Sequence, residues 1–236
     1  YLPNMLGWFL ITSQTKPEDV DWMLARAAGY NAGYALVVRY DAIKNNPFIN
    51  EIVEQVNSWT EAQQKNAFSP AQKQWLRVPE HDVHLERDGV NAWKMYRYKK
   101  VVFEHSAKVL QPGEPTSSEW TFQNNTGKQN VQVILLAAGN TGEISNPVIE
   151  LDNSLRIQLP VNLKAGQSLV IDHSASANLY DQKGKFLKKV TLPQPLPELA
   201  EGSHHLLFDC AFSEGADINV KITVKLSDGI EKVQAK

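Results

Sequence analysis

The period of the apolar pattern changes between residues 79 and 91, and this change constrains the fold more than any other feature. Residues 1–79 read as strand, helix, strand, helix, with apolar runs at 5–11 and 34–38 and helical stripes that begin near Pro17 and Pro47. From residue 91 onward, apolar residues recur at every second position, which is typical of half-buried strands. An α/β segment followed by an all-β segment is therefore expected.

The first segment has too few strands to complete an α/β domain. Parallel strands joined by helices need more neighbours and a covering layer on both faces. The run at 34–38 is almost wholly apolar, as in a doubly buried strand, and Val20, Met23, Leu24 and Ala27 form the stripe of a helix over 17–29. We predict that the two strands pair in parallel and that much of any catalytic apparatus lies in a longer protein.

The second segment contains many short strand candidates. They lie at 119–123, 130–137, 155–159, 168–172, 177–181, 186–190, 204–212 and 217–226, and Gly-containing turn signals separate several of them. This spacing predicts an antiparallel β-sandwich, jelly-roll-like, over residues 91–236. Residues 80–90 are polar and read as a linker or an edge strand.

Composition excludes several classes of protein. A net charge of −2 argues against a nucleic-acid partner, and no apolar run approaches the roughly 20 residues of a membrane span. The single cysteine, Cys210, cannot form an internal disulfide and suits a small buried side chain. No glycine-rich phosphate loop, Cys-x-x-Cys pair or nucleophile elbow is present, so no cofactor is expected.

Parts of both segments resemble a known family. The stretches LGWFLI (6–11), EDVDWMLARAAGYNAG (18–33) and RYD (39–41) are similar to the last two βα units of a glycoside-hydrolase-type (β/α)8 barrel, as in Bacteroides-type exported proteins. The stretches LKAGQSLVID (163–172) and ANLYDQKGKFL (177–187) resemble a galactose-binding-like β-sandwich appended to such enzymes. The expected architecture is thus a partial barrel remnant (1–79), a linker (80–90) and a sandwich (91–236).

The resemblance implies the C-terminal portion of a carbohydrate-active protein from a bacterial periplasm, cell envelope or secreted set. Carbohydrate is the implied partner, and either self-association or a missing N-terminal barrel segment would cover the unfilled sheet. The alternative is a non-catalytic structural or protein-interaction module. The sequence does not identify the glycan or the linkage, and we expect residues 1–236 alone to be inactive as a hydrolase.

Candidate catalytic residues follow the two N-terminal strands. Glycoside hydrolysis needs two carboxylates about 5–10 Å apart, and barrel sites form at the C-terminal ends of strands. Asp41 is the carboxylate in that position, and Arg39 would orient it. The alternative is a structural Arg–Asp pair or a helix-capping Asp41. Trp8 would stack on a sugar ring, or it belongs to a barrel core.

The second segment offers candidate sugar contacts. Aromatic rings hold the C–H face of a sugar, and amides and carboxylates bond to its hydroxyls. Tyr180 beside Asn178 and Asp181 is the first candidate group, and Trp120 the second. The alternative is core packing, which the alternation of residues 119–122 favours for Trp120.

The histidines do not form a convincing metal motif. His81 and His84, with Glu86, have a ligand-like spacing but lack a second half of the site. His204 and His205 would point to opposite faces of a strand. No metal site is predicted.

Overall fold

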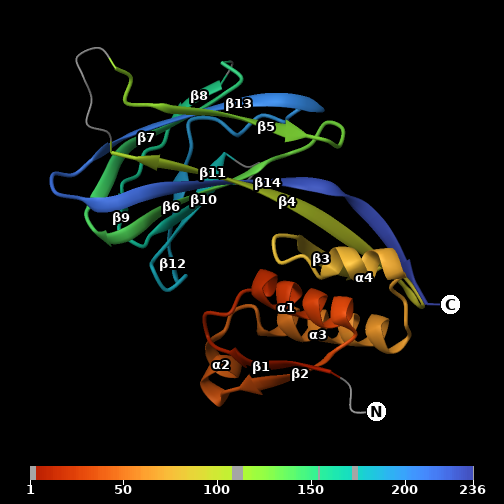
Figure 1. Ribbon diagram of the computed structural model, residues 1–236. Coiled ribbons are helices and arrows are strands. Elements are labelled where there is room, and N and C mark those ends of the chain that lie inside the picture. The colour runs from red at the N-terminus through yellow and green to blue at the C-terminus, as the bar shows by residue number, and fades with distance from the viewer. Residues whose placement is uncertain (1–3, 108–113, 154, 172–174, 236) are drawn as a thin grey trace. The chain divides into compact units, whose positions relative to one another are not determined.

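The computed structural model describes residues 4–107, 114–153, 155–171 and 175–235, and the chain divides into two compact units (Figure 1). The first unit comprises residues 1–99 and 227–236, and the second comprises residues 100–226. Two long strands, β4 (Ala92–Ser106) and β14 (Asp217–Gln234), each contribute residues to both units. The C-terminal residues are therefore part of the unit that the N-terminal residues form.

The first unit contains all four helices of the described residues. Its elements are β1 (Met5–Ile11), α1 (Pro17–Tyr30), β2 (Gly33–Val38), α2 (Tyr40–Asn45), α3 (Ile49–Gln64), α4 (Pro70–Leu76) and β3 (Asp82–Arg87). Strands β1 and β2 pair in parallel, and α1 packs against α3, α4 and β3. The predicted parallel pairing and the predicted helix over 17–29 are confirmed.

Local chemistry explains the helix ends. Pro17 occupies the first turn of α1, where its missing N–H costs nothing, and Asn31 ends the helix in the left-handed conformation. Ser69 and Gln72 form a reciprocal capping box at the start of α4. Gly29 allows α1 and α4 to approach closely, since a Cβ there would lie 3.0 Å from the Leu76 carbonyl carbon.

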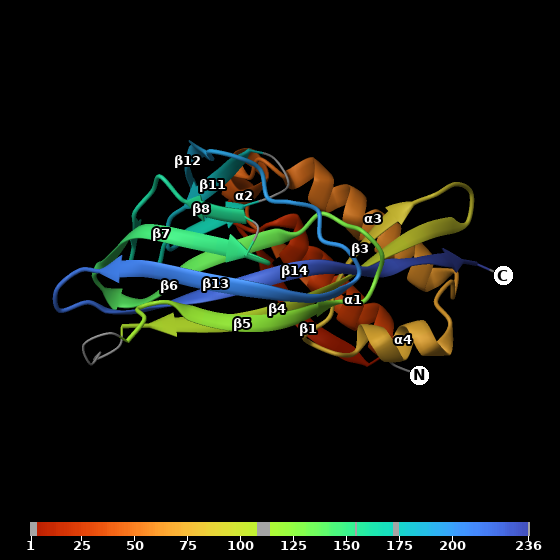
Figure 2. The same cartoon turned by 90° about the horizontal axis from the view of Figure 1, so that it is seen from above.

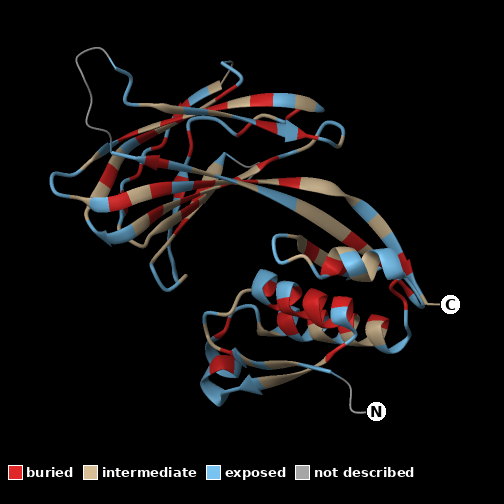
Figure 3. Ribbon diagram, viewed as in Figure 1, coloured by how far each residue is buried: buried red, intermediate tan, exposed pale blue. Residues whose placement is uncertain are grey.

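The core of the first unit lies around α1. Val20, Met23, Leu24 and Ala27 are buried, as the apolar stripe predicts. The core also takes side chains from α3, α4, β3, β4 and the end of β14, among them Trp59, Leu76, Leu85, Trp93 and Val233. Figure 3 shows this burial along α1, in contrast to the mostly intermediate and exposed colours along β1 and β2.

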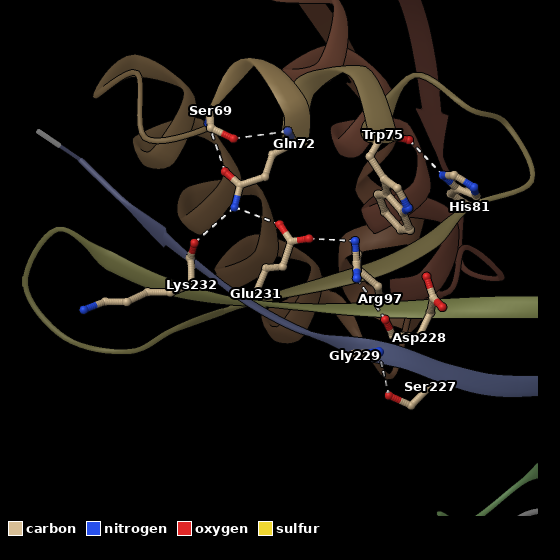
Figure 4. A network of polar contacts seen from close by, with 10 residues as sticks. All are labelled: Ser69, Gln72, Trp75, His81, Arg97, Ser227, Asp228, Gly229, Glu231 and Lys232. Carbon is tan, nitrogen blue, oxygen red and sulfur yellow. Dashed lines mark hydrogen bonds and ion pairs between the residues drawn. The ribbon is translucent and has the colours of Figure 1, made fainter. Parts of the chain in front are cut away.

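Polar contacts attach the end of β14 to α4 and β4 (Figure 4). The amide of Gln72 donates to the carboxylate of Glu231 at 3.0 Å and to the Lys232 carbonyl at 3.1 Å. Glu231 also forms an ion pair with Arg97 at 2.6 Å, and the Arg97 guanidinium lies over the ring of Trp75. These contacts join residues that are far apart in the sequence.

The second unit is built from two antiparallel sheets. Its further strands are β5 (Ser118–Asn124), β6 (Gln132–Thr141), β7 (Glu143–Leu151), β8 (Leu155–Gln158), β9 (Leu163–Lys164), β10 (Ser168–Ile171), β11 (Ser176–Tyr180), β12 (Phe186–Thr191) and β13 (Gly202–Phe212). One sheet has the order β12-β11-β10-β6-β14-β4-β3, and the other has the order β5-β13-β7-β8, with β9 also paired to β7. The sheets are sandwich-like, as expected for this part of the chain.

Alternation along these strands forms a common core. On β6, Val133, Leu135 and Ala137 are buried, while the residues between them are partly exposed. Leu206 and Phe208 of β13, in the other sheet, belong to the same apolar cluster. The period of two that appears in the sequence therefore reflects one buried face on each sheet.

The expectation of a partial (β/α) barrel is wrong. Strands outnumber helices, and the sheets are antiparallel apart from the isolated pair β1–β2 among the described residues. Helix α1 packs against β3 and α4 instead of covering a larger parallel sheet. A local strand–helix–strand pattern specifies the crossover but not the number of strands beside it. Residues 82–87 of the predicted linker form β3, the edge strand of the seven-stranded sheet.

Candidate functional site

An open depression of about 710 Å³ lies in the second unit, bordered by strands of both sheets. Its lining comes mainly from the start of β7, the β8–β9 connection and β12, and β8 and β12 are labelled in Figure 2. The residues that line it are Glu143, Asn146, Gln158, Leu159, Pro160, Val161, Asn162, Lys164, Gln167, Lys188 and Pro193. The volume is within the usual range of small-ligand sites.

Hydrogen bonds among the lining residues orient the polar side chains of this depression. The Asn162 amide donates to the Glu143 carboxylate at 2.8 Å, and the Gln158 amide lies 3.4 Å from the side-chain oxygen of Asn146. The Gln167 side-chain oxygen accepts from the backbone N–H of Lys164 at 3.0 Å. Each amide group can make several hydrogen bonds, so these contacts orient the groups and leave capacity for a ligand.

Apolar surface lies among these polar groups. Leu159 and Val161 are buried, and the rings of Pro160 and Pro193 line the depression beside them. The combination offers hydrogen-bonding groups for hydroxyls and C–H surface for a ring face. Sequence reasoning missed this site, because its residues come from connections and strand ends that only the sheet pairing brings together.

Tyr180 and Asn178 lie on the other face of the sheet from the depression. They alternate along β11 with the buried Ala177 and Leu179, so their side chains point away from the core. The Tyr180 ring packs edge-on against Phe186, with the ring centroids 6.0 Å apart. Asp181 is part of the β11–β12 turn, where its carboxylate accepts from the backbone N–H groups of Lys183 and Lys185. Tyr180 and Asn178 therefore lie on the same outer face of β11, whereas the Asp181 carboxylate forms hydrogen bonds within its own turn.

The two tryptophan candidates have opposite environments. Trp120 packs against the core of the second unit and stacks on Phe103 with ring centroids 5.0 Å apart. Trp8 is 75% exposed on β1, beside Ala35 of β2, so the alternative of a barrel-core Trp8 is wrong. The neighbouring Leu10 and Val37 are exposed too, and neither β1 nor β2 contains an Asn or Gln that could bond to sugar hydroxyls.

The catalytic candidates lie on the surface around the start of α2. Arg39 is the N-cap residue, Asp41 is in the first turn, and both are exposed. No ion pair joins them in the described part of the chain. A carboxylate near a helix N-terminus is stabilised by the helix dipole, which is the capping-type alternative for Asp41. Within the described ranges, neither the Arg39 nor the Asp41 side chain forms a hydrogen bond or an ion pair with another side chain.

A buried polar cluster in the first unit escaped sequence reasoning. The carboxylate of Asp21 accepts hydrogen bonds from the Gln55 amide at 2.9 Å and the Trp59 indole at 2.7 Å, and its Oδ2 lies 2.8 Å from Nδ1 of His84. Asp21 is 3% exposed. In the sequence, the sign of this cluster is that the acidic Asp21 lies on the apolar stripe of the predicted helix, three residues before Leu24.

Burial and hydrogen bonding shift the protonation of this cluster. Burial raises the pKa of Asp21 above its usual value, although the hydrogen bonds from His84 and Trp59 oppose the shift. The hydrogen bond to Asp21 raises the pKa of His84 above 6.5. Shifted groups of this kind occur in structural networks as well as in active sites. Here the carboxylate joins α1, α3 and β3.

The other histidines have separate partners. Nδ1 of His81 lies 2.9 Å from the Trp75 carbonyl, and the Glu86 carboxylate accepts from Tyr96. His204 contacts Asp152 through Nδ1 and the Ala200 carbonyl through Nε2. Among the described residues, no group of three or more His, Cys, Asp and Glu is placed to hold a metal ion.

No helix in the described ranges is long and apolar enough to cross a membrane.

Comparison with known proteins adds little to this geometry. No protein-family profile matches the sequence, and no curated protein matches it.

Two solved structures show weak similarity. An isomalto-dextranase from Arthrobacter globiformis T6, complexed with panose, has 8% identity and a TM-score of 0.21 over 92% of this chain. This chain spans about half of that enzyme, 49% of its length. The P-domain of Macrobrachium rosenbergii nodavirus has 9% identity and a TM-score of 0.14, and the match covers 55% of this chain and 94% of that domain. These TM-scores do not indicate a shared fold.

Proposed function

We propose that the second unit binds carbohydrate in the depression between β8–β9 and β12, as part of a carbohydrate-active protein. The observation that supports this is the combination of four amide side chains, one carboxylate and a proline-rich apolar surface in one open depression. From the family resemblance alone, we also propose that the protein lies in the bacterial periplasm, in the cell envelope or outside the cell.

The chemistry of the depression suits a hydroxyl-rich ligand. Asn146, Gln158, Asn162 and Gln167 each present both donors and acceptors, and every sugar hydroxyl can serve as either partner. Pro160 and Pro193 offer C–H surface to a sugar ring. No aromatic side chain is among the described lining residues, so we expect weak binding, with a Kd on the order of 0.1–1 mM.

A glycan array followed by isothermal titration calorimetry tests the proposal. The variants Gln158→Ala and Asn162→Ala should weaken binding of the selected glycan by about tenfold each, because each removes a hydrogen-bonding side chain from the site. Gln123→Ala is the matched control, since Gln123 is exposed on β5 and is not among the residues that line the depression. Tyr180→Ala tests the other face of the sheet. Full binding by the two depression variants, with loss only in Tyr180→Ala, would move the site to that face.

A second candidate function is protein interaction through the β1–β2 sheet. Trp8, Leu10 and Val37 are exposed there, and neither strand contains a charged residue. Soluble proteins usually protect such edges and faces with charges or with a covering element. An interaction role would use the first unit and leave the proposed sugar site in the second unit unchanged.

A further inference from the structure

Lysines lie in the lining of the depression and on the hairpin that adjoins it. Lys164 of β9 and Lys188 of β12 line it, and Lys183, Lys185 and Lys189 lie on the adjoining β11–β12 hairpin. Within the described residues, no ion pair involves any of these five ammonium groups. The chain as a whole has a net charge of −2, whereas Lys164, Lys188 and Glu143 give the lining of the depression a formal net charge of +1.

The carboxylates nearby do not balance this charge. Glu143 is the one carboxylate among the described lining residues, and it lies opposite Lys164 in the β7–β9 pair, whereas Lys188 lies opposite Leu179. Asp181 is directed to the backbone N–H groups of its own turn, and Glu143 accepts from Asn162. The two lysines that line the depression therefore exceed its one carboxylate by a single positive charge, which favours an anionic group there.

Protection of a sheet edge explains only part of this arrangement. Strand β12 is the edge of the seven-stranded sheet, and lysines on edge strands prevent pairing with other chains. Lys164 belongs to β9, which pairs with β7 in the other sheet, yet it borders the same depression. Because β9 pairs with β7 alone among the described pairings, edge protection applies to Lys164 as well, but it gives no reason for both lysines to line one depression.

The register of β12 separates two neighbouring lysines. Lys188 is opposite the buried Leu179, so its side chain starts on the core side of the sheet, where the depression lies. Lys189 is opposite Asn178 and starts on the outer side. The depression thus has one lysine from each sheet, Lys188 and Lys164, while Lys189 points away from it.

We propose that the depression selects sugars with an anionic substituent, a carboxylate or a sulfate, which Lys164 and Lys188 bind while the amides bind hydroxyls. This inference rests on the proposed sugar-binding function and adds the chemical class of the ligand. Ammonium groups form charge-assisted hydrogen bonds with such anions, and these bonds are stronger than neutral ones.

Titration of matched oligosaccharides tests the selectivity. Tetragalacturonate and its methyl ester have the same backbone and differ in charge, and a sulfated galactose oligosaccharide distinguishes sulfate from carboxylate recognition. We expect at least about tenfold tighter binding of an acidic ligand than of the ester, and weaker binding at higher salt. Preference for either acidic ligand supports the proposal and identifies its anion.

Lysine variants locate the anion contact. Lys164→Gln and Lys188→Gln should each reduce acidic-ligand affinity by about tenfold without weakening the ester. Lys189→Gln is the matched control on the opposite face of the same strand, and Lys128→Gln, whose lysine pairs with Glu198, is a distant one. Equal losses in Lys188→Gln and Lys189→Gln would indicate a general charge effect and overturn the proposal.

The failures of the two proposals are distinguishable. Equal affinity for the acid and the ester, with both lost in Gln158→Ala, would leave the sugar site in place and overturn its anion selectivity. Absence of binding to every neutral and acidic oligosaccharide would overturn both proposals. Circular dichroism and thermal unfolding of each variant show whether the fold is retained.

Discussion

Asp21 occupies a core position of α1, where an apolar residue would complete the stripe. It is 3% exposed, and its two oxygens accept from α3 and contact His84 of β3. A buried carboxylate is tolerated only when its hydrogen bonds are satisfied. The cluster therefore determines how α1, α3 and β3 pack together.

Asp21→Asn should lower the free energy of unfolding by about 2–4 kcal/mol. The new amide would place two N–H donors where the neighbours are also donors, leaving buried groups unpaired. Urea denaturation followed by tryptophan fluorescence measures the change. Glu54→Gln, an exposed carboxylate-to-amide change on α3, is the control and should be nearly neutral. Equal stability of Asp21→Asn and wild type would contradict a stabilising role for the cluster.

Stability should fall as pH rises through the folded-state pKa of His84. The hydrogen bond to Asp21 raises this pKa above 6.5, so the folded protein holds the proton more tightly than the unfolded chain does. The contribution is complete below about pH 6.5 and is lost above the folded-state pKa. Because the His84 side chain is 39% exposed, screening keeps the effect below about 1 kcal/mol.

Denaturant unfolding between pH 5.5 and 9 measures the His84 effect against His84→Gln. The wild type should lose more stability over this range than the variant, which cannot titrate at this position. Parallel pH profiles for the two proteins would argue against the proton linkage.

Asp41 should not support glycoside hydrolysis by this chain. It is exposed in the first turn of α2, and a two-carboxylate mechanism needs a partner at a fixed distance. We expect no release of nitrophenol from 4-nitrophenyl glycosides above the level of Asp41→Asn. Turnover by the wild type that disappears in Asp41→Asn would show that this prediction is wrong.

At the scale of elements, the β1–β2 sheet is poorly protected against association with other chains. Both strands lack charged residues, and their sheet has two strands, whereas parallel sheets are usually covered on both faces. The sequence predicted self-association from this apolar edge, and the exposure of Trp8 and Leu10 supports the same prediction.

Light scattering over a concentration series tests the association. The apparent mass of the wild type should rise with concentration, and Leu10→Lys should shift the chain towards monomer by placing a charge on the apolar face. Val90→Lys is the matched control, because Val90 is 89% exposed in the turn between β3 and β4. A wild type that stays monomeric at every concentration would count against association through this sheet.

At the scale of the whole molecule, the two units share strands that are distant in sequence. The end of β14 contributes Val233 to the core of the first unit, and Glu231 bonds to Gln72 and Arg97. The N-terminal unit therefore needs the last residues of the chain for its core. The family-like division into residues 1–79 and 91–236 differs from the observed units, whose boundaries follow residues 99 and 226.

Val233→Ala should destabilise the first unit by about 2 kcal/mol, because it removes fully buried methyl groups from the core around α1. Hydrogen exchange should become faster in α1 and α4, while the amides of β7 and β13 keep their wild-type protection. Val90→Ala is the exposed control. Unchanged exchange in α1 and α4 would indicate that the C-terminal strand does not support the first unit.

Much of the local structure follows from the sequence alone. The stripe of Val20, Met23, Leu24 and Ala27 predicts α1, and the apolar run at 34–38 predicts β2. The period of two predicts most strands of the second unit. These features depend on interactions between residues that are close in the chain, so the order of the residues is enough to predict them.

Tertiary structure alone decided the strand partners and the sites. The apolar run of β2 does not state how many strands lie beside it, so the barrel resemblance suggested neighbours that the sheet lacks. Asp21 meets His84 across 63 residues, and Lys164 and Lys188 meet at one depression from different sheets. Such contacts form because burial of the apolar faces favours one strand pairing among many. The alternation along a strand shows which of its faces is buried, but it does not show which strand or helix covers that face.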